Sequence, residues 1–170
     1  MTEHPRPSPK VDATMLRDIG LFGGISRETL ELLARELPTE QAEVGHVVVR
    51  EGDDARDMYV VVNGELEVVK RGRSDHEVRV ALFGPGDWFG EMGILAVQPR
   101  SATVRSVAPT LLVRITPENV EQLIYRRDVK DYALFMMNIA RELSRRLRVA
   151  DGILTQFVAT VSSEYVQKKK

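Results

Sequence analysis

The chain has 170 residues, 43% of them hydrophobic, and a formal net charge of −1 at pH 7. This length and composition fit one packed domain with room for an appended helix, and the nearly neutral charge argues against a generic nucleic-acid-binding surface. The lack of cysteine excludes disulfides, iron–sulfur clusters and cysteine nucleophiles, and the lack of a long apolar run or an apolar signal core leads us to expect a cytoplasmic protein without a membrane span.

The N-terminal region is predicted to be a flexible arm followed by helices. Prolines at positions 5, 7 and 9 favour an extended or disordered arm, which we assign to residues 1–13. Residues 14–37 have helical spacing, and Ser26 is a suitable N-cap for the segment that carries Leu30 and Leu33 on one face.

The middle of the chain, residues 44–115, is predicted to be β structure. Short β-branched runs alternate there with turn signals, a spacing typical of an all-β barrel or jelly roll. Asn63-Gly64 is the sharpest hairpin signal among the turns. We expect a β-jelly-roll barrel flanked by N-terminal helices and a long C-terminal helix, with strands at residues 47–49, 58–62, 66–69, 78–82, 102–107 and 111–115.

The C-terminal region is predicted to be helical. Thr116-Pro117-Glu118 is typical of a helix start, a short helix is expected to reach Tyr125, and Asp128 is expected to cap a longer helix. Gly152 weakens that longer helix by about 1 kcal/mol relative to alanine and marks a candidate kink or end.

From residue 133 the apolar side chains of this helix follow a heptad pattern typical of a coiled-coil seam. Part of the seam is expected to pack on the barrel, but for its C-terminal half another chain is the better partner. We therefore expect a parallel homodimer through residues 133–161. The seam positions are Ala133, Met136, Ala140, Leu143, Leu147, Ala150, Leu154, Phe157 and Val161.

Residues 89–104 combine Phe-Gly-Glu-Met-Gly with Pro-Arg-Ser-Ala-Thr, and these residue types suit a phosphodiester site. Arg100 offers a permanent charge and a planar fork for two phosphate oxygens, and Ser101 adds a hydroxyl donor. Backbone N–H groups near Gly90 and Gly93 can approach an anion closely because glycine lacks Cβ.

Glu91 is expected to play a different role, because a carboxylate repels a phosphate. It can accept a hydrogen bond from a ribose hydroxyl, and Arg100 nearby would keep it ionised. A short helical turn over residues 91–96 would point further N–H groups at the phosphate. The competing interpretation is an ordinary surface ion pair beside a turn.

The same stretch closely resembles the phosphate-binding cassette of cyclic-nucleotide-binding domains, which reads Phe-Gly-Glu-small-Gly/Ala, a short spacer and Pro-Arg-x-Ala-Thr/Ser. The resemblance extends over residues 14–150, and the pattern is similar to the sensor half of bacterial catabolite activator proteins and to the regulatory subunits of cyclic-AMP-dependent protein kinases. Seven positions fall in register, which favours the binding site over the surface ion pair. They are Gly90, Glu91, Gly93, Pro99, Arg100, Ala102 and Thr103.

The resemblance also implies a C-terminal helix that closes over the base. In the activator proteins this helix contacts adenine through a Thr-Ser pair that follows an Arg-Arg-Leu run, whereas here the equivalent pair is Ala150-Asp151. Asp151 either accepts from an exocyclic amine or is solvated, and Arg146 either reaches the opposite pocket or is solvated. The expected ligand-binding residues are therefore Phe89, Gly90, Glu91, Met92, Gly93, Arg100, Ser101, Ala102, Arg146 and Asp151.

The resemblance implies a receptor without an enzyme site, which relays ligand occupancy through its C-terminal helix to an effector protein. We favour cAMP as the ligand over cGMP, although the Ser101 hydroxyl also suits a syn guanine. No cofactor is expected, and His4, His46 and His76 lie too far apart in the sequence to suggest a metal site.

Residues 151–170 are expected to form only a helical extension with a basic tail, so direct sequence-specific DNA binding is not expected. The alternative function is a scaffold or dimerisation protein that keeps the fold without binding a nucleotide.

Overall fold

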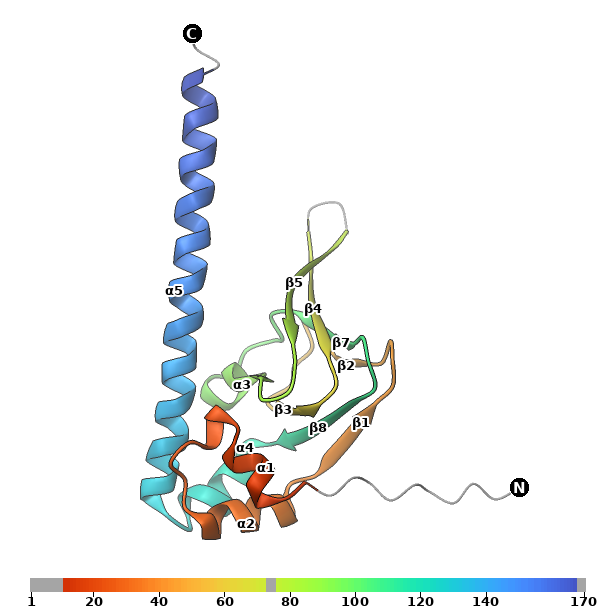
Figure 1. Ribbon diagram of the computed structural model, residues 1–170, viewed down its shortest axis with the longest axis vertical. Helices are drawn as coiled ribbons and strands as arrows, with labels where there is room; N and C mark the ends of the chain where they lie inside the picture. Colours follow the sequence, from red (N-terminus) through yellow and green to blue (C-terminus); the bar gives the residue numbers. More distant parts are fainter. Residues whose placement is uncertain (1–10, 73–75, 168–170) are drawn as a thin grey trace, which may run out of the picture.

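The computed structural model describes residues 11–72 and 76–167. Most of the expected N-terminal arm, His4 and the three terminal lysines lie outside these ranges. The described part consists of an N-terminal helical unit, a β barrel and a long C-terminal helix that rises well past the barrel (Figure 1).

The N-terminal unit contains α1 (Ala13–Arg17), the 3₁₀-helix η1 (Gly20–Phe22) and α2 (Arg27–Glu36). Ser26 caps α2 as predicted, because its side chain accepts from the backbone N–H of Thr29. The apolar face of α2 is buried against the outside of the barrel and the start of the C-terminal helix.

The described strands form two four-stranded antiparallel sheets, with the orders β1-β8-β3-β6 and β2-β7-β4-β5, which confirms the predicted jelly-roll barrel. All six expected strands are present. Two more were not predicted, because β1 has polar composition and β6 has only two residues. The bounds are β1 (Thr39–Ala42), β2 (Val47–Val49), β3 (Met58–Asn63), β4 (Leu66–Arg71), β5 (Glu77–Phe83), β6 (Trp88–Phe89), β7 (Thr103–Ser106) and β8 (Thr110–Ile115).

The prediction of a hairpin at Asn63-Gly64 is wrong, although the chain does bend there, at Gly64 with φ +95°. The strands on its two sides, β3 and β4, belong to different sheets and pair with other strands. The bend therefore forms a corner of the barrel. The local signal for a break between two strands was correct, but sheet membership depends on pairing with β8 and β7. The paired residues of β8 and β7 lie about 35 to 55 positions later in the chain.

Two apolar clusters hold these layers together. One lies between the N-terminal helices, the sheet that contains β3 and β8, and the first turns of the C-terminal helix. The other fills the barrel interior between the two sheets. The barrel therefore provides a rigid frame on which the loops and the helix are placed.

The C-terminal segment contains α4 (Pro117–Asn119), the π-helix η3 (Val120–Tyr125) and α5 (Val129–Gln167). Thr116 opens the segment with a capping box, and Asp128 caps α5 as predicted, since its carboxylate accepts from the N–H groups of Lys130 and Asp131. The short helix to Tyr125 has π rather than α geometry for most of its length. Helix α5 continues through Gly152 without ending there (Figure 1).

Helix α5 is fixed to the domain only along its first half. Asn138 donates to the carbonyls of Leu21 and Gly23, and Met136 and Leu143 pack against the core. The seam residues beyond this point are exposed, namely Leu147, Leu154, Phe157 and Val161. Among the described helices, none is long and apolar enough to cross a membrane.

Candidate functional site

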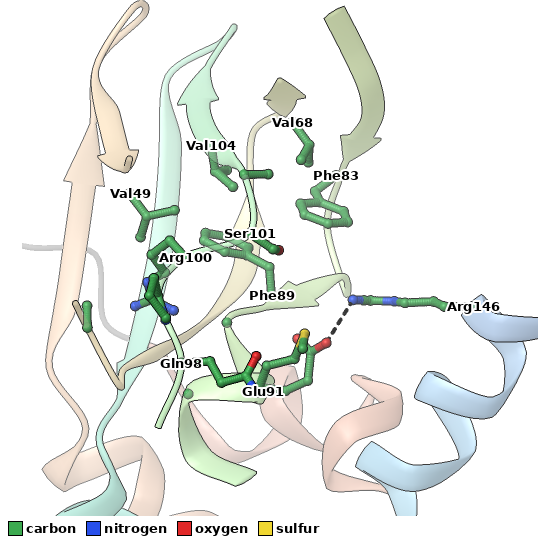
Figure 2. Close-up of a pocket in the computed structure, with 16 residues that line it drawn as sticks. Val49, Val68, Phe83, Phe89, Glu91, Gln98, Arg100, Ser101, Val104 and Arg146 are labelled. Carbon is green, nitrogen blue, oxygen red and sulfur yellow. Dashed lines mark hydrogen bonds and ion pairs between the residues drawn. The ribbon is translucent and has the colours of Figure 1, made fainter. Parts of the chain in front are cut away.

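A pocket opens on the barrel between the cassette, the strands and α5 (Figure 2). It brings together all but one of the residues predicted from the sequence. The exception is Asp151, which is exposed and does not line the pocket. The lining residues are Val49, Ala55, Val68, Phe83, Phe89, Gly90, Glu91, Met92, Gly93, Gln98, Pro99, Arg100, Ser101, Ala102, Val104 and Arg146.

The cassette backbone depends on two glycines of the short helix α3 (Glu91–Leu95). Gly90 is its N-cap, and Gly93 lies inside it. Gly90 has φ +83°, and a Cβ there would lie 2.6 Å from Nη1 of Arg100 and from the carbonyl oxygen of Asp57. A Cβ on Gly93 would lie 2.8 Å from the backbone of Arg56. The expected helical turn over residues 91–96 is thus present almost in full, and it sits against the loop before β3.

Arg100 is a buried cation whose side chain has no ion-pair partner among the residues that the structure describes. Its residue is only 8% exposed, its Nε has no hydrogen-bond partner, and it forms no ion pair within residues 11–72 and 76–167. Burial lowers the pKa of its guanidinium, although nearby Tyr59, Asp57 and Asp53 oppose this shift. Because an arginine stays charged in proteins, this site favours an anion.

The backbone of Arg100 is held in place by the loop of residues 52 and 53. Its N–H donates to the carbonyl of Asp53 at 2.9 Å, and its carbonyl accepts from the N–H of Gly52 at 2.8 Å. The side chain therefore projects from a fixed point in the pocket wall.

Glu91 is buried, at 5% exposure, and its ion-pair partner is Arg146 of α5 rather than Arg100. Nη1 of Arg146 lies 3.3 Å from Oε1 of Glu91 (Figure 2). Nη2 of Arg146 donates to the carbonyl of Trp88 at 2.7 Å, and Nε donates to Glu142 at 2.8 Å. One guanidinium therefore links the cassette, β6 and α5.

Glu142 orients this arginine. Hydrogen bonds from Arg145 and Arg146 lower the pKa of Glu142 to about 2, against the opposing effect of burial. Glu142 is therefore ionised at neutral pH and keeps the Arg146 guanidinium directed towards the pocket.

The strand side chains at the other end of the pocket were missed by the sequence analysis. Val49, Val68, Phe83 and Val104 form an apolar wall above the cassette (Figure 2). The period-2 alternation of strands was an available signal, because Val68 shares a face with buried Leu66. That signal shows which side chains point inwards, but not which of them line an open pocket.

His46 and His76 are both exposed, and the part of the chain that the structure describes has no group of three His, Cys, Asp or Glu side chains that could hold a metal ion. Nothing in the geometry of the described residues adds support for a metal site.

The sequence profile of the cyclic nucleotide-binding domain family matches residues 39–127, and the chain belongs to this family. It is 32% identical over 131 residues to the cyclic AMP receptor protein of Thermus thermophilus, an alignment that covers 77% of this chain and 58% of that protein. It is 25% identical over 158 residues to the CRP-like cAMP-activated global transcriptional regulator of Mycobacterium tuberculosis, covering 90% of this chain and 68% of that protein.

The fold agrees with these relatives. The crystal structure of the Thermus thermophilus catabolite activator protein matches with a TM-score of 0.72 and 31% identity, covering 81% of this chain and 62% of that chain. The family resemblance drawn from residues 89–104 is thereby confirmed.

Proposed function

We propose that the protein is a cytoplasmic receptor for a cyclic nucleotide, with cAMP favoured over cGMP. The observation that carries this proposal is Arg100, a buried cation without an acceptor among the described residues, in a pocket that also contains the buried carboxylate of Glu91. A cyclic phosphate supplies the missing acceptor, and a ribose hydroxyl suits the carboxylate. The names of the relatives support cAMP.

In this proposal the cassette binds the sugar-phosphate. Arg100 and Ser101 hold the phosphate oxygens, and the N–H groups around Gly90 and Gly93 approach the same anion. Glu91 accepts from the ribose 2′-OH, with Arg146 balancing its charge. We assign the binding domain to residues 14–150. We do not propose an enzymatic activity for it.

Signal relay is proposed to pass through α5. Arg146 is the link, because it contacts Glu91 and the Trp88 carbonyl at the pocket and Glu142 on its own helix. A ligand that engages Glu91 changes the contacts of Arg146, and α5 responds as a rigid rod. The output is an effector protein rather than direct sequence-specific binding to DNA.

A parallel homodimer through residues 133–161 is part of the same proposal. Leu154 and Phe157 are 60% and 65% exposed, although they continue the apolar stripe that α5 buries lower down through Met136 and Leu143. Exposed apolar side chains at heptad spacing favour a second helix as the partner.

The test is isothermal titration calorimetry of the purified protein with cAMP and cGMP. We expect micromolar or tighter binding, and a loss of at least about a hundredfold in Arg100→Ala, because removing one partner of a buried charge pair costs about 3–5 kcal/mol. Arg17→Ala is the control, since Arg17 lies on α1 and does not line the pocket.

Unchanged affinity in Arg100→Ala would contradict the assigned phosphate site. Absence of binding to either nucleotide would favour the alternative function, a scaffold or dimerisation protein with the same fold, for which the exposed half of α5 is the interaction surface.

A further inference from the structure

A second groove lies between the cassette helix α3, the helical segment of α4 and η3, and the first turns of α5, which lie side by side (Figure 1). No residue lines both this groove and the pocket that contains Arg100. Leu95 and Tyr125 in its lining are 44% and 45% exposed, so apolar and aromatic groups face water there. An apolar groove on a protein surface marks a binding site for another segment of protein.

Two tyrosines shape the groove. Tyr125 and Tyr132 meet edge to face, with ring centroids 5.1 Å apart and an interplanar angle of 71°. Tyr125 ends the π-helix η3, in which the N–H of Arg126 donates to the carbonyl of Glu121 at 3.0 Å. Such π-helical turns are rare and occur frequently at functional sites. Pro117 lies in the same lining, so the groove has the aromatic character by which proteins bind proline-rich segments.

Glu121 adds a carboxylate to this surface. It is the one charged side chain in the described lining of the groove. Its ion-pair partner is Arg126, with Nε 3.0 Å from Oε1, and the two side chains are 61% and 47% exposed. An exposed pair of this kind contributes little to stability, so Glu121 can take another cation at little cost. The groove therefore suits a segment that combines flat apolar rings with one positive charge.

The N-terminal arm of this chain has that composition. It reads Met-Thr-Glu-His-Pro-Arg-Pro-Ser-Pro-Lys, so Arg6 stands between two prolines and a third proline follows Ser8. Prolines favour the extended polyproline II backbone, which loses little conformational entropy when it binds. Arg6 and Lys10 outweigh Glu3, so the charge of the arm is opposite to that of Glu121.

The groove is within reach of the arm. Val11, the first described residue, is buried in the apolar cluster that also contains Val120, and Ile94 and Tyr132 pack against the same cluster. Ten residues with about 3.1 Å of rise each span about 31 Å. A compact domain of about 100 residues has a radius of gyration of about 13 Å. The arm therefore spans the distance without any rearrangement of the domain.

We propose that this groove binds the chain's own N-terminal arm, residues 1–10, with the prolines against Tyr125 and Tyr132 and with Arg6 paired to Glu121. The tether favours the chain's own arm over a free partner, because a short covalent link gives a high effective concentration. The bound arm covers Leu95 at the end of α3. This inference is independent of the proposed nucleotide binding, since the groove and the pocket have no residue in common.

The test is disulfide cross-linking in the full chain, which has no cysteine of its own. Ser8→Cys with Leu95→Cys places one thiol in the arm and one in the groove, and it keeps both tyrosines and Glu121. Ser8→Cys with Leu32→Cys is the matched control, because Leu32 lies in a polar hollow beside α2. Under mild oxidation we expect the Leu95 pair to close at least about ten times faster than the Leu32 pair, since docking concentrates the arm at the groove.

Charge exchange tests the contact between Arg6 and Glu121. In the Leu95 pair we expect Glu121→Lys to slow closure by a factor of about two to five, the worth of an exposed ion pair. Addition of Arg6→Glu should restore the rate, which a purely structural effect of Glu121→Lys would not allow. Tyr125→Ser should also slow closure, whereas Tyr125→Phe keeps the ring and should leave the rate unchanged.

Three results would overturn the inference. Equal closure rates in the two cysteine pairs would show that the arm does not occupy the groove, which would leave it to another protein. A bridge that joins two copies on a non-reducing gel, rather than closing within one, would assign the groove to the arm of a second copy. Failure of Arg6→Glu to restore closure would contradict the pairing with Glu121. Nucleotide titration decides the proposed function separately from all three.

Discussion

Arg146 and Glu91 lie 55 positions apart in the chain and form an ion pair, with Nη1 3.3 Å from Oε1. Glu91 begins the cassette helix α3, and Arg146 lies in the middle of α5. The pair therefore couples the element that contacts the ligand in our proposal to the element that extends past the barrel. Five predictions test this arrangement and its surroundings.

Removal of Arg146 should loosen α5 from the barrel. Arg146→Ala deletes the contacts to Glu91, the Trp88 carbonyl and Glu142 at once, so we expect faster amide exchange along residues 142–150 in hydrogen–deuterium exchange. Arg148→Ala is the control, since the described contact of Arg148 is Ser144 on the same helix. Equal exchange in both variants would contradict the linking role of Arg146.

Glu91→Ala should weaken cyclic-nucleotide binding, but less than Arg100→Ala. The loss of one hydrogen bond to a charged group is worth about 1.5–3 kcal/mol, which is about 10- to 150-fold in affinity. Calorimetry with cAMP measures both variants. A larger loss for Glu91→Ala than for Arg100→Ala would reverse the roles that we assign to the two residues.

Gly90→Ala should destabilise the fold more than Gly86→Ala. Both glycines have φ near +90°, where an alanine is strained by about 1–2 kcal/mol. A Cβ at position 90 also overlaps Arg100 and the Asp57 carbonyl, whereas a Cβ at position 86 meets nothing within 4 Å. We expect about 1–3 kcal/mol of further loss from this overlap. Urea denaturation measures the difference, and equal loss would show that backbone strain alone matters.

The contribution of Glu142 to stability should disappear only in acid. Its pKa is lowered from 4.5 to about 2 in the folded protein, so the folded state favours the ionised form. The stabilisation is therefore complete above about pH 4.5 and is lost as the pH falls towards 2. We expect the difference in free energy of unfolding between the wild type and Glu142→Gln to be constant from pH 5 to 7 and to shrink below that range. A difference that grows on acidification would contradict the ion pairs with Arg145 and Arg146.

The exposed half of α5 should mediate dimerisation. Leu154→Glu places a charge in the apolar seam, and we expect it to convert a dimer to a monomer in sedimentation analysis while cyclic-nucleotide affinity is retained. Gln156→Glu adds the same charge away from the seam and should leave the dimer intact. A wild-type monomer at micromolar concentration would refute the proposed interface.

The sequence by itself determined the barrel class, the helix starts and the cassette. Ser26, Thr116 and Asp128 are caps whose hydrogen bonds reach only two or three residues along the chain, so local composition suffices to find them. The cassette is similarly local, because Gly90, Glu91 and Arg100 occur within eleven positions and their spacing is set by one short helix and one loop.

The tertiary structure determined the contacts between residues that lie far apart in the chain. It placed Asn63-Gly64 at a corner between two sheets rather than in a hairpin, because β3 and β4 find their partners elsewhere. It joined Glu91 to Arg146 and left Asp151 outside the pocket, since the position of α5 is set by the packing of Phe135 and Ile139 in the core. Barrel closure also stacked Phe83 on Phe89 in the wall of the pocket. Such contacts depend on where whole elements pack, and no local pattern of residues encodes that placement.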